Sequence, residues 1–245
     1  MAACPTGGQL CEPCVPCLCS CLVCCHPGVR WRVAGASGTA LTIDDFPSKH
    51  MRAEDFWALL RMLKGANGGK GVHATFFVIW SRVVDRPEHQ QQLIAMRNNG
   101  HEIAVHYDGR WGWARTAESY LSESDGFLAF CERNGIELRF VRPPGGFATR
   151  AFVDRHFASR MKLITVIGTA YPFDADLCEC MPPAWIGRCA AGLSAGGGRI
   201  VILHAGKRLH EKVVCFLRHA ARQHVGTLSD VVDEDHDVTA RMLQP

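Results

Sequence analysis

The chain lacks the features that usually mark a membrane-spanning or nucleic-acid-binding protein. Its 245 residues contain no uninterrupted run of about 18 uncharged apolar residues, the length that a membrane-spanning helix needs. They also contain no run of five or more Lys or Arg, and 27 basic against 24 acidic residues leave a net charge of only +3. This charge is too small to indicate a nucleic-acid partner or an anionic membrane surface. With 47% hydrophobic and 21% charged residues, the composition is typical of a globular protein and excludes disorder, collagen and coiled coil.

The first 25 residues lack Lys and Arg and differ in composition from the rest of the chain. They hold eight of the 13 cysteines. Because Pro13 and Pro16 interrupt the apolar part and no basic segment precedes it, this stretch does not read as a secretory signal peptide. We expect residues 1–30 to be a disordered Cys-rich tail. Two other interpretations stay open, an S-acylated anchor at a membrane surface and a cluster that binds a soft metal. The sequence assigns no other compartment.

From residue 31 to the end of the chain, apolar or β-rich runs alternate with segments of helical periodicity. In residues 56–63, for example, apolar side chains fall at i, i+3, i+4 and i+7, the spacing of an amphipathic helix. Strands and helices alternating at intervals of roughly 30 residues predict an α/β fold of about seven parallel strands with helices outside. We find no internal repeat and treat residues 31–245 as one domain. The expected strands are residues 39–43, 72–79, 101–106, 137–141, 163–168, 199–203 and 225–228.

Polar residues follow several of these expected strands at the point where each strand ends. Asp44 and Asp45 come after residues 41–43, His106 ends the third run, Arg142 follows the fourth and His204 follows the sixth. Parallel βα folds place their sites at the carboxyl ends of the strands. Two carboxylates, two histidines and an arginine at this edge are the ingredients of a divalent metal site with an acid and a base beside it.

Each of these residues also has an ordinary structural interpretation. The two aspartates could form a turn that caps the next helix, His204 could be a hydrogen-bonded core residue, and Arg142 could belong to a rigid Pro-Gly turn. Adjacent side chains on a strand point to opposite faces, so the two aspartates need a local twist to share a site. By the same parity, His101 is directed to the other face from His106, and we expect it to be structural.

Five ordered blocks of this sequence resemble the motifs of the polysaccharide deacetylases, the NodB homology group or carbohydrate esterase family 4. The resemblance extends over about residues 38–232 and implies a distorted (β/α) barrel that hydrolyses N-acetyl groups on amino-sugar polymers with a divalent metal. It makes residues 31–245 a deacetylase-like catalytic domain whose partner is an N-acetylated saccharide. The blocks are TIDDFP at 42–47, ATFFV at 74–78, GHEIAVH at 100–106, RPPG at 142–145 and ILH at 202–204.

The resemblance also implies a role for each residue that matches a motif. Asp44 would be the general base and Asp45 a metal ligand, with His106 as the first histidine ligand. Arg142 would orient the base, and His204 would be the general acid. Asp174 lies in the region of the fourth motif, which lacks its usual tryptophan.

One position departs from the family pattern. The second histidine ligand of the family comes four residues after the first, where this chain has Arg110. Arginine cannot ligate a metal, but the Asp108 carboxylate lies within local reach. A set of Asp45, His106 and Asp108 suits zinc or another divalent ion. A turn at Asp108 with no metal, or a ligand from elsewhere in the chain, are the alternatives.

The sequence therefore predicts a metal-dependent deacetylase of chitin- or peptidoglycan-like polymers or oligomers. Two other functions stay open, because the second histidine is lost: a cyclic-amide hydrolase of the same fold group, and a catalytically degenerate saccharide-binding domain. The retention of base, orienting arginine and acid argues against the binding domain, since a binder needs none of the three. Nothing in the sequence assigns an oligomeric state.

Overall fold

A computed structural model describes residues 29–30, 38–49, 51–108, 117–146, 149–159, 162–172, 174, 181–206 and 208–232. Its core is an eight-stranded sheet with the strand order β1-β6-β5-β4-β3-β2-β7, in which β8 pairs with β2. All of the strand pairs are parallel. The strands are β1 (Val29–Arg30), β2 (Thr39–Phe46), β3 (Thr75–Ile79), β4 (Glu102–His106), β5 (Phe140–Arg142), β6 (Ile164–Val166), β7 (Arg199–His204) and β8 (Val225–Gly226).

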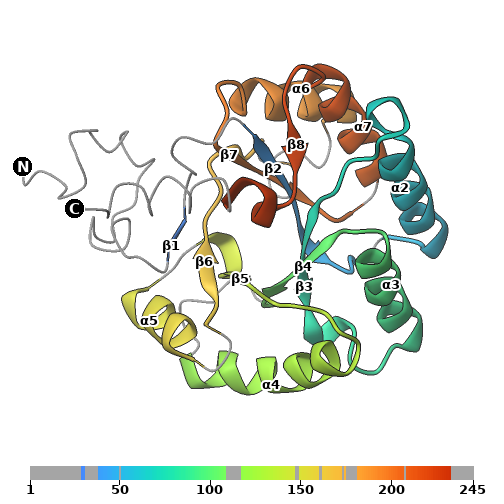
Figure 1. The fold of residues 1–245 in the computed structure, drawn as a ribbon. Coiled ribbons are helices and arrows are strands. Elements are labelled where there is room, and N and C mark those ends of the chain that lie inside the picture. The colour runs from blue at the N-terminus through green and yellow to red at the C-terminus, as the bar shows by residue number, and fades with distance from the viewer. Residues whose placement is uncertain are drawn as a thin grey trace, which may run out of the picture.

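Helices surround the sheet and complete the distorted (β/α) barrel that the sequence predicted (Figure 1). Each of the seven expected strands is present, which confirms the alternation of strands and helices. Strand β1 is additional: it pairs with β6, so the sheet begins before the boundary that we drew between residues 30 and 31. The helices are α2 (Ala53–Gly65), α3 (Pro87–Asn98), α4 (Ala117–Arg133), α5 (Arg150–Ala158), α6 (Pro183–Leu193) and α7 (Leu209–His219).

Alternation along the strands gives the sheet two apolar faces. The outer face of β2 contributes Leu41 and Ile43 to a core shared with the helices, where the predicted stripe of α2 is buried. The inner face contributes Ala40 of β2 and Phe77 of β3 to a smaller core inside the barrel. Residues of one parity therefore face the barrel interior, and the catalytic candidates share that parity.

His101 lies on the outer side, as its parity predicted. Its ring packs edge-on against Phe76, and its Nδ1 accepts a hydrogen bond from the backbone N–H of Ala74 at 3.2 Å. Burial, helped by the neighbouring His73, lowers the pKa of His101 to about 4. The residue is therefore a neutral structural histidine near neutral pH.

The barrel closes loosely between β6 and β7. The segment after β6 approaches β7, where Ala170 forms an isolated parallel bridge with Val201. A Cβ atom at Gly168 would lie 2.5 Å from the Ile202 side chain, so only glycine permits this approach. The carboxyl end of β7, with His204, is thereby held next to the segment that leads to Asp174.

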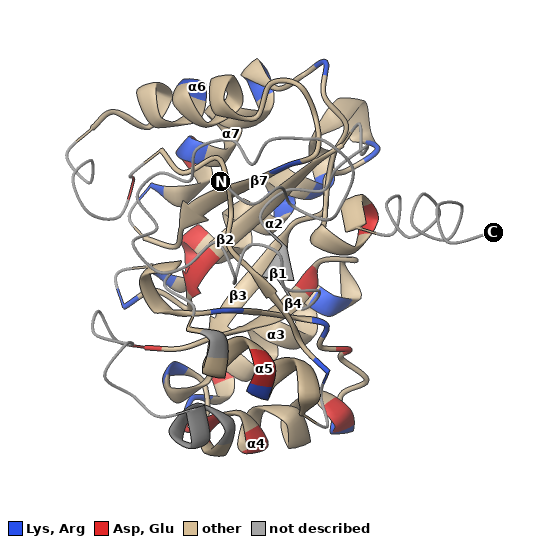
Figure 2. Ribbon diagram, turned by 90° about the vertical axis from the view of Figure 1, so that its left-hand side faces the viewer, with Lys and Arg blue, Asp and Glu red and all other residues tan. Residues whose placement is uncertain are grey.

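Figure 2 shows that most residues of the strands are neither acidic nor basic, and that many of the charged residues lie on helices. Within the described ranges, the structure has no helix of the length and apolar character needed to cross a membrane. The Cys-rich segment before residue 29 lies outside the described residues, as does Arg110.

Candidate active site

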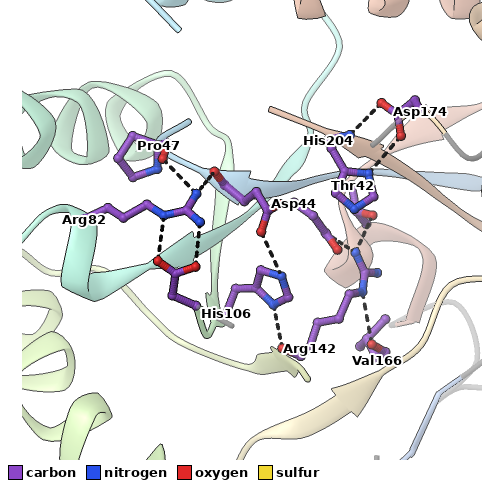
Figure 3. A network of polar contacts seen from close by, with 11 residues as sticks. Thr42, Asp44, Pro47, Arg82, His106, Arg142, Val166, Asp174 and His204 are labelled. Carbon is purple, nitrogen blue, oxygen red and sulfur yellow. Dashed lines mark hydrogen bonds and ion pairs between the residues drawn. The ribbon is translucent and has the colours of Figure 1, made fainter. Parts of the chain in front are cut away.

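Four predicted site residues meet at the carboxyl ends of the strands (Figure 3). Asp44 on β2 is the register partner of His204 on β7, and His106 on β4 is the register partner of Arg142 on β5. All four occupy alternate strand positions whose side chains face the barrel interior. The expectation that strand ends would assemble these side chains is therefore met, although they come from four different strands.

Asp44 and Arg142 form an ion pair that is almost completely buried, with side chains 4% and 1% exposed. Arginine Nη1 donates to the Asp44 carboxylate and to Thr42 Oγ1, the latter at 2.9 Å, and Nε donates to the Val166 carbonyl at 3.1 Å. The guanidinium carbon also lies 4.0 Å from the centroid of the Phe77 ring. Burial lowers the pKa of Arg142, and the Asp44 carboxylate counteracts this effect. These contacts fix the Asp44 carboxylate in one orientation.

The two adjacent aspartates share the site because the backbone is twisted between them. Asp45 has φ of 60°, in the left-handed region, and the pairing of β2 with β3 slips in register between Ile43 and Phe46. Aspartate tolerates this conformation better than most residues, because its short polar side chain can bond locally. The slip turns Asp45 toward His106 while Asp44 stays on the inner face. It is the local twist that the sequence required.

Asp45 and the neutral form of His106 face each other as two acceptors. His106 Nδ1 donates to the Arg142 carbonyl at 2.7 Å, which leaves the lone pair of Nε2 directed at Asp45 Oδ1, 3.4 Å away. Burial raises the pKa of Asp45, but a hydrogen bond from the protonated form of His106 and the positive charges of His106, His204 and Arg82 lower it to about 2. A proton or a metal cation between the two acceptors is needed to make this contact favourable.

This pair fits two donors of a divalent ion. A tetrahedral ion about 2.1 Å from an imidazole nitrogen and a carboxylate oxygen would separate those atoms by about 3.4 Å, the spacing seen here. The carbonyl that fixes the imidazole is the usual outer partner of a metal-binding histidine. In the part of the chain that the structure describes, no third His, Cys, Asp or Glu joins them to make a three-residue group.

The predicted third ligand, Asp108, is engaged elsewhere. Its carboxylate accepts hydrogen bonds from Arg82 Nη2 at 2.9 Å and Nε at 3.4 Å. The Arg82 hydrogen bond lowers the pKa of Asp108 below its usual range. Asp108 therefore lies beside the pair as a carboxylate bound to arginine.

His204 is held from behind by Asp174. Asp174 Oδ1 accepts from His204 Nδ1 at 2.8 Å, and Oδ2 accepts from the His204 backbone N–H and from Lys212 Nζ, each at 2.9 Å. Burial on its own lowers the pKa of His204, but the hydrogen bond to Asp174 and the charges of Asp44, Asp174 and Asp45 outweigh it and raise the pKa. His204 is thus suited to hold a proton at Nε2.

Sequence reasoning missed two residues of this site. Arg82 follows β3 and carries no motif signal, and Lys212 falls on the buried side of α7 among apolar residues. A buried lysine needs an anionic partner, so its place in that apolar stripe was the one available clue. No comparable pattern marks Arg82.

Comparison of the sequence with protein-family models gives a match to the family described as polysaccharide deacetylase over residues 34–158, about half of the chain. This region contains Asp44, Asp45, His106 and Arg142 but ends before His204. No curated protein sequence matches the chain significantly.

The fold is similar to that of several solved structures. A family 4 carbohydrate esterase pseudoenzyme from Bacillus anthracis has a TM-score of 0.70 at 18% identity, covering 85% of this chain and 70% of that chain. A mutant of the peptidoglycan deacetylase PdaC from Bacillus subtilis has a TM-score of 0.66 at 22% identity, covering 85% and 96%. The chitin deacetylase of Colletotrichum lindemuthianum has a TM-score of 0.66 at 15% identity, covering 83% and 91%. With the family match and the barrel that carries its motifs, the chain belongs to the polysaccharide deacetylase family.

Proposed function

We propose that the protein hydrolyses N-acetyl groups on chitin- or peptidoglycan-like amino-sugar polymers or oligomers. The observation that carries the proposal is the pairing of two supported groups at one site: Asp44 held by Arg142, and His204 held by Asp174. Asp44 and His204 are register partners on neighbouring strands, so both groups reach one substrate. Family membership supports the reaction class, and solved relatives include deacetylases of peptidoglycan and of chitin.

The proposed reaction divides proton transfer between these two groups. Asp44 accepts a proton from the attacking water as the water oxygen bonds to the acetyl carbon. His204 donates its Nε2 proton to the amide nitrogen as the carbon–nitrogen bond breaks, and acetate and a free amine leave. Arg142 keeps the Asp44 carboxylate directed at the water. Asp174 accepts a hydrogen bond from Nδ1 of His204, so the second proton of the protonated ring lies on Nε2, toward the substrate. A positioned acid or base of this kind contributes about 10²- to 10⁴-fold in rate.

Asp45 and His106 would hold the divalent ion, with zinc as the expected metal. Their facing acceptor atoms and the carbonyl behind His106 support this assignment. When bound, the ion would supply Lewis-acid chemistry, because it lowers the pKa of water and polarises a carbonyl oxygen. Asp108 and Arg82 lie at the edge of the same site.

A second candidate function is saccharide binding without catalysis. It is favoured by one observation: the described residues bring only two metal donors together, while the carboxylate expected as third donor is bound to Arg82. The presence of pseudoenzymes among the structural relatives supports keeping this candidate.

Acetate release separates these functions. Protein purified and loaded with Zn²⁺ is incubated with chitin oligomers, with peptidoglycan fragments and with a cyclic ureide, and released acetate and ring opening are measured. Acetate from a saccharide that disappears in Asp44→Asn supports the deacetylase. Ring opening of the ureide would instead identify a cyclic-amide hydrolase. Saccharide binding by calorimetry with no product from any substrate would identify the binding domain.

A further inference from the structure

Arg82 connects the carboxyl ends of β2 and β4, where the metal-donor candidates lie. Its Nη1 donates to the carbonyls of Asp45 at 3.1 Å and Pro47 at 3.3 Å, both in the segment at the end of β2. Its Nη2 and Nε bind the Asp108 carboxylate, which follows β4. One guanidinium, that of Arg82 (Figure 3), therefore contacts both the backbone carbonyl of Asp45 and the carboxylate of Asp108.

The contacts of Arg82 place a permanent positive charge beside the Asp45–His106 pair. The Arg82 side chain is 17% exposed and the Asp108 side chain 43% exposed, so their ion pair lies at the mouth of the site. Two-pronged binding of a carboxylate by arginine is among the stronger hydrogen-bonded pairs in proteins. While this pair is intact, the Asp108 oxygens are occupied by N–H donors and a dication at the neighbouring pair is repelled.

We propose that Arg82 limits divalent metal binding at this site by holding the Asp108 carboxylate, which becomes the third donor beside Asp45 and His106 when Arg82 releases it. Arg82 and a metal ion then compete for one carboxylate. The inference rests on the proposed function only in assigning a divalent ion to Asp45 and His106. Nothing in it depends on which saccharide is the substrate.

Zinc affinity, measured by competition with a chromophoric chelator, tests the proposal without an activity assay. Arg82→Gln removes the cation and the two-pronged grip, so Zn²⁺ affinity should rise at least about 10-fold. Adding Asp108→Asn should cancel most of that gain. In the otherwise unchanged protein, Asp108→Asn alone should alter the affinity by less than about 3-fold, because Arg82 already occupies the carboxylate.

A matched control separates the hydrogen bonds that Arg82 donates to Asp108 from the simple removal of a positive charge. Lys49 is exposed and lies close enough to lower the pKa of Asp108, yet no hydrogen bond to Asp108 is among its contacts. Lys49→Gln should therefore change Zn²⁺ affinity far less than Arg82→Gln, and an equal change would overturn the proposal.

Three further results would overturn it: unchanged or weaker Zn²⁺ binding in a folded Arg82→Gln protein, a gain that survives Asp108→Asn, or a loss of 10-fold or more in Asp108→Asn alone. The last result would overturn the proposal even where Arg82→Gln fails to fold, as judged by circular dichroism. Acetate release is measured separately, so a protein without deacetylase activity can still show this competition, and an active one can lack it.

Discussion

Asp44 and His204 are register partners on the neighbouring parallel strands β2 and β7, and each is supported by a buried charge on another element. Arg142 on β5 binds Asp44, while Asp174 binds His204. Asp44 and His204 therefore lie side by side on adjacent strands, each with its charged partner on another element. This arrangement suits a base and an acid that act on opposite sides of one carbon–nitrogen bond.

Loss of the Asp44 carboxylate or of the His204 imidazole should lower turnover without changing metal binding. Asp44→Asn and His204→Ala should each lower acetate release from N-acetylglucosamine oligomers by at least about 10²-fold, with Zn²⁺ content unchanged. Because both residues serve one reaction, the double variant should be less than multiplicatively worse. Asp85→Asn, which changes an exposed carboxylate, is the control and should retain full activity. Full activity in Asp44→Asn would remove Asp44 as the base.

The pKa of His204 should move in opposite directions when its two buried neighbours are changed. The hydrogen bond and charge of Asp174, with the charges of Asp44 and Asp45, raise this pKa against the effect of burial. Asp174→Asn should lower it, so the basic limb of the pH profile of kcat/KM should shift to lower pH. Lys212→Met should raise it, because the Asp174 charge is then no longer shared with a lysine.

Nuclear magnetic resonance titration of the His204 ring gives the same answer without catalysis. The resonance is assigned by its disappearance in His204→Ala. Shifts in the same direction for Asp174→Asn and Lys212→Met would contradict the electrostatic account of this site. An unchanged resonance in both would show that Asp174 does not control the acid.

Arg142→Met should destabilise the protein by about 3–5 kcal/mol, because it leaves the Asp44 carboxylate buried without its partner. Adding Asp44→Asn to Arg142→Met should recover part of that loss, since the unpaired charge is then removed. Urea unfolding followed by fluorescence measures all three proteins. A double variant that is less stable than Arg142→Met would indicate that the ion pair is not the main role of Arg142 in the fold.

Hydrophobic periodicity predicted a parallel α/β fold with outer helices, and the family resemblance implied its closure into a distorted barrel. The seven expected strands are present because each has apolar residues that are buried in the outer or the inner core. Such apolar runs are a property of the local sequence. Parity also placed His101 outside and His106 inside. Residues that follow the strands directly could therefore be assigned to one edge of the sheet.

Contacts between loops could not be predicted in this way. The left-handed conformation of Asp45 depends on the register slip between β2 and β3, which no composition or spacing reveals. The engagement of Asp108 by Arg82 joins residues 26 positions apart through a loop arrangement set by the whole barrel. A two-residue spacing from His106 made Asp108 an available ligand, but local spacing holds no information about a competing partner.

His101 should make the protein less stable in mild acid. Its pKa falls from 6.5 to about 4, chiefly through burial, so between these values the unfolded chain binds a proton that the folded protein does not. Stability is therefore lost as the pH falls from about 6.5 to 4, with a contribution from this residue of up to about 3 kcal/mol. In His101→Asn that contribution is absent, so the difference in unfolding free energy between variant and wild type should narrow or change sign on acidification. Urea unfolding at pH 7.5 and pH 4.5 measures it, and a difference that stays constant would show that His101 titrates normally.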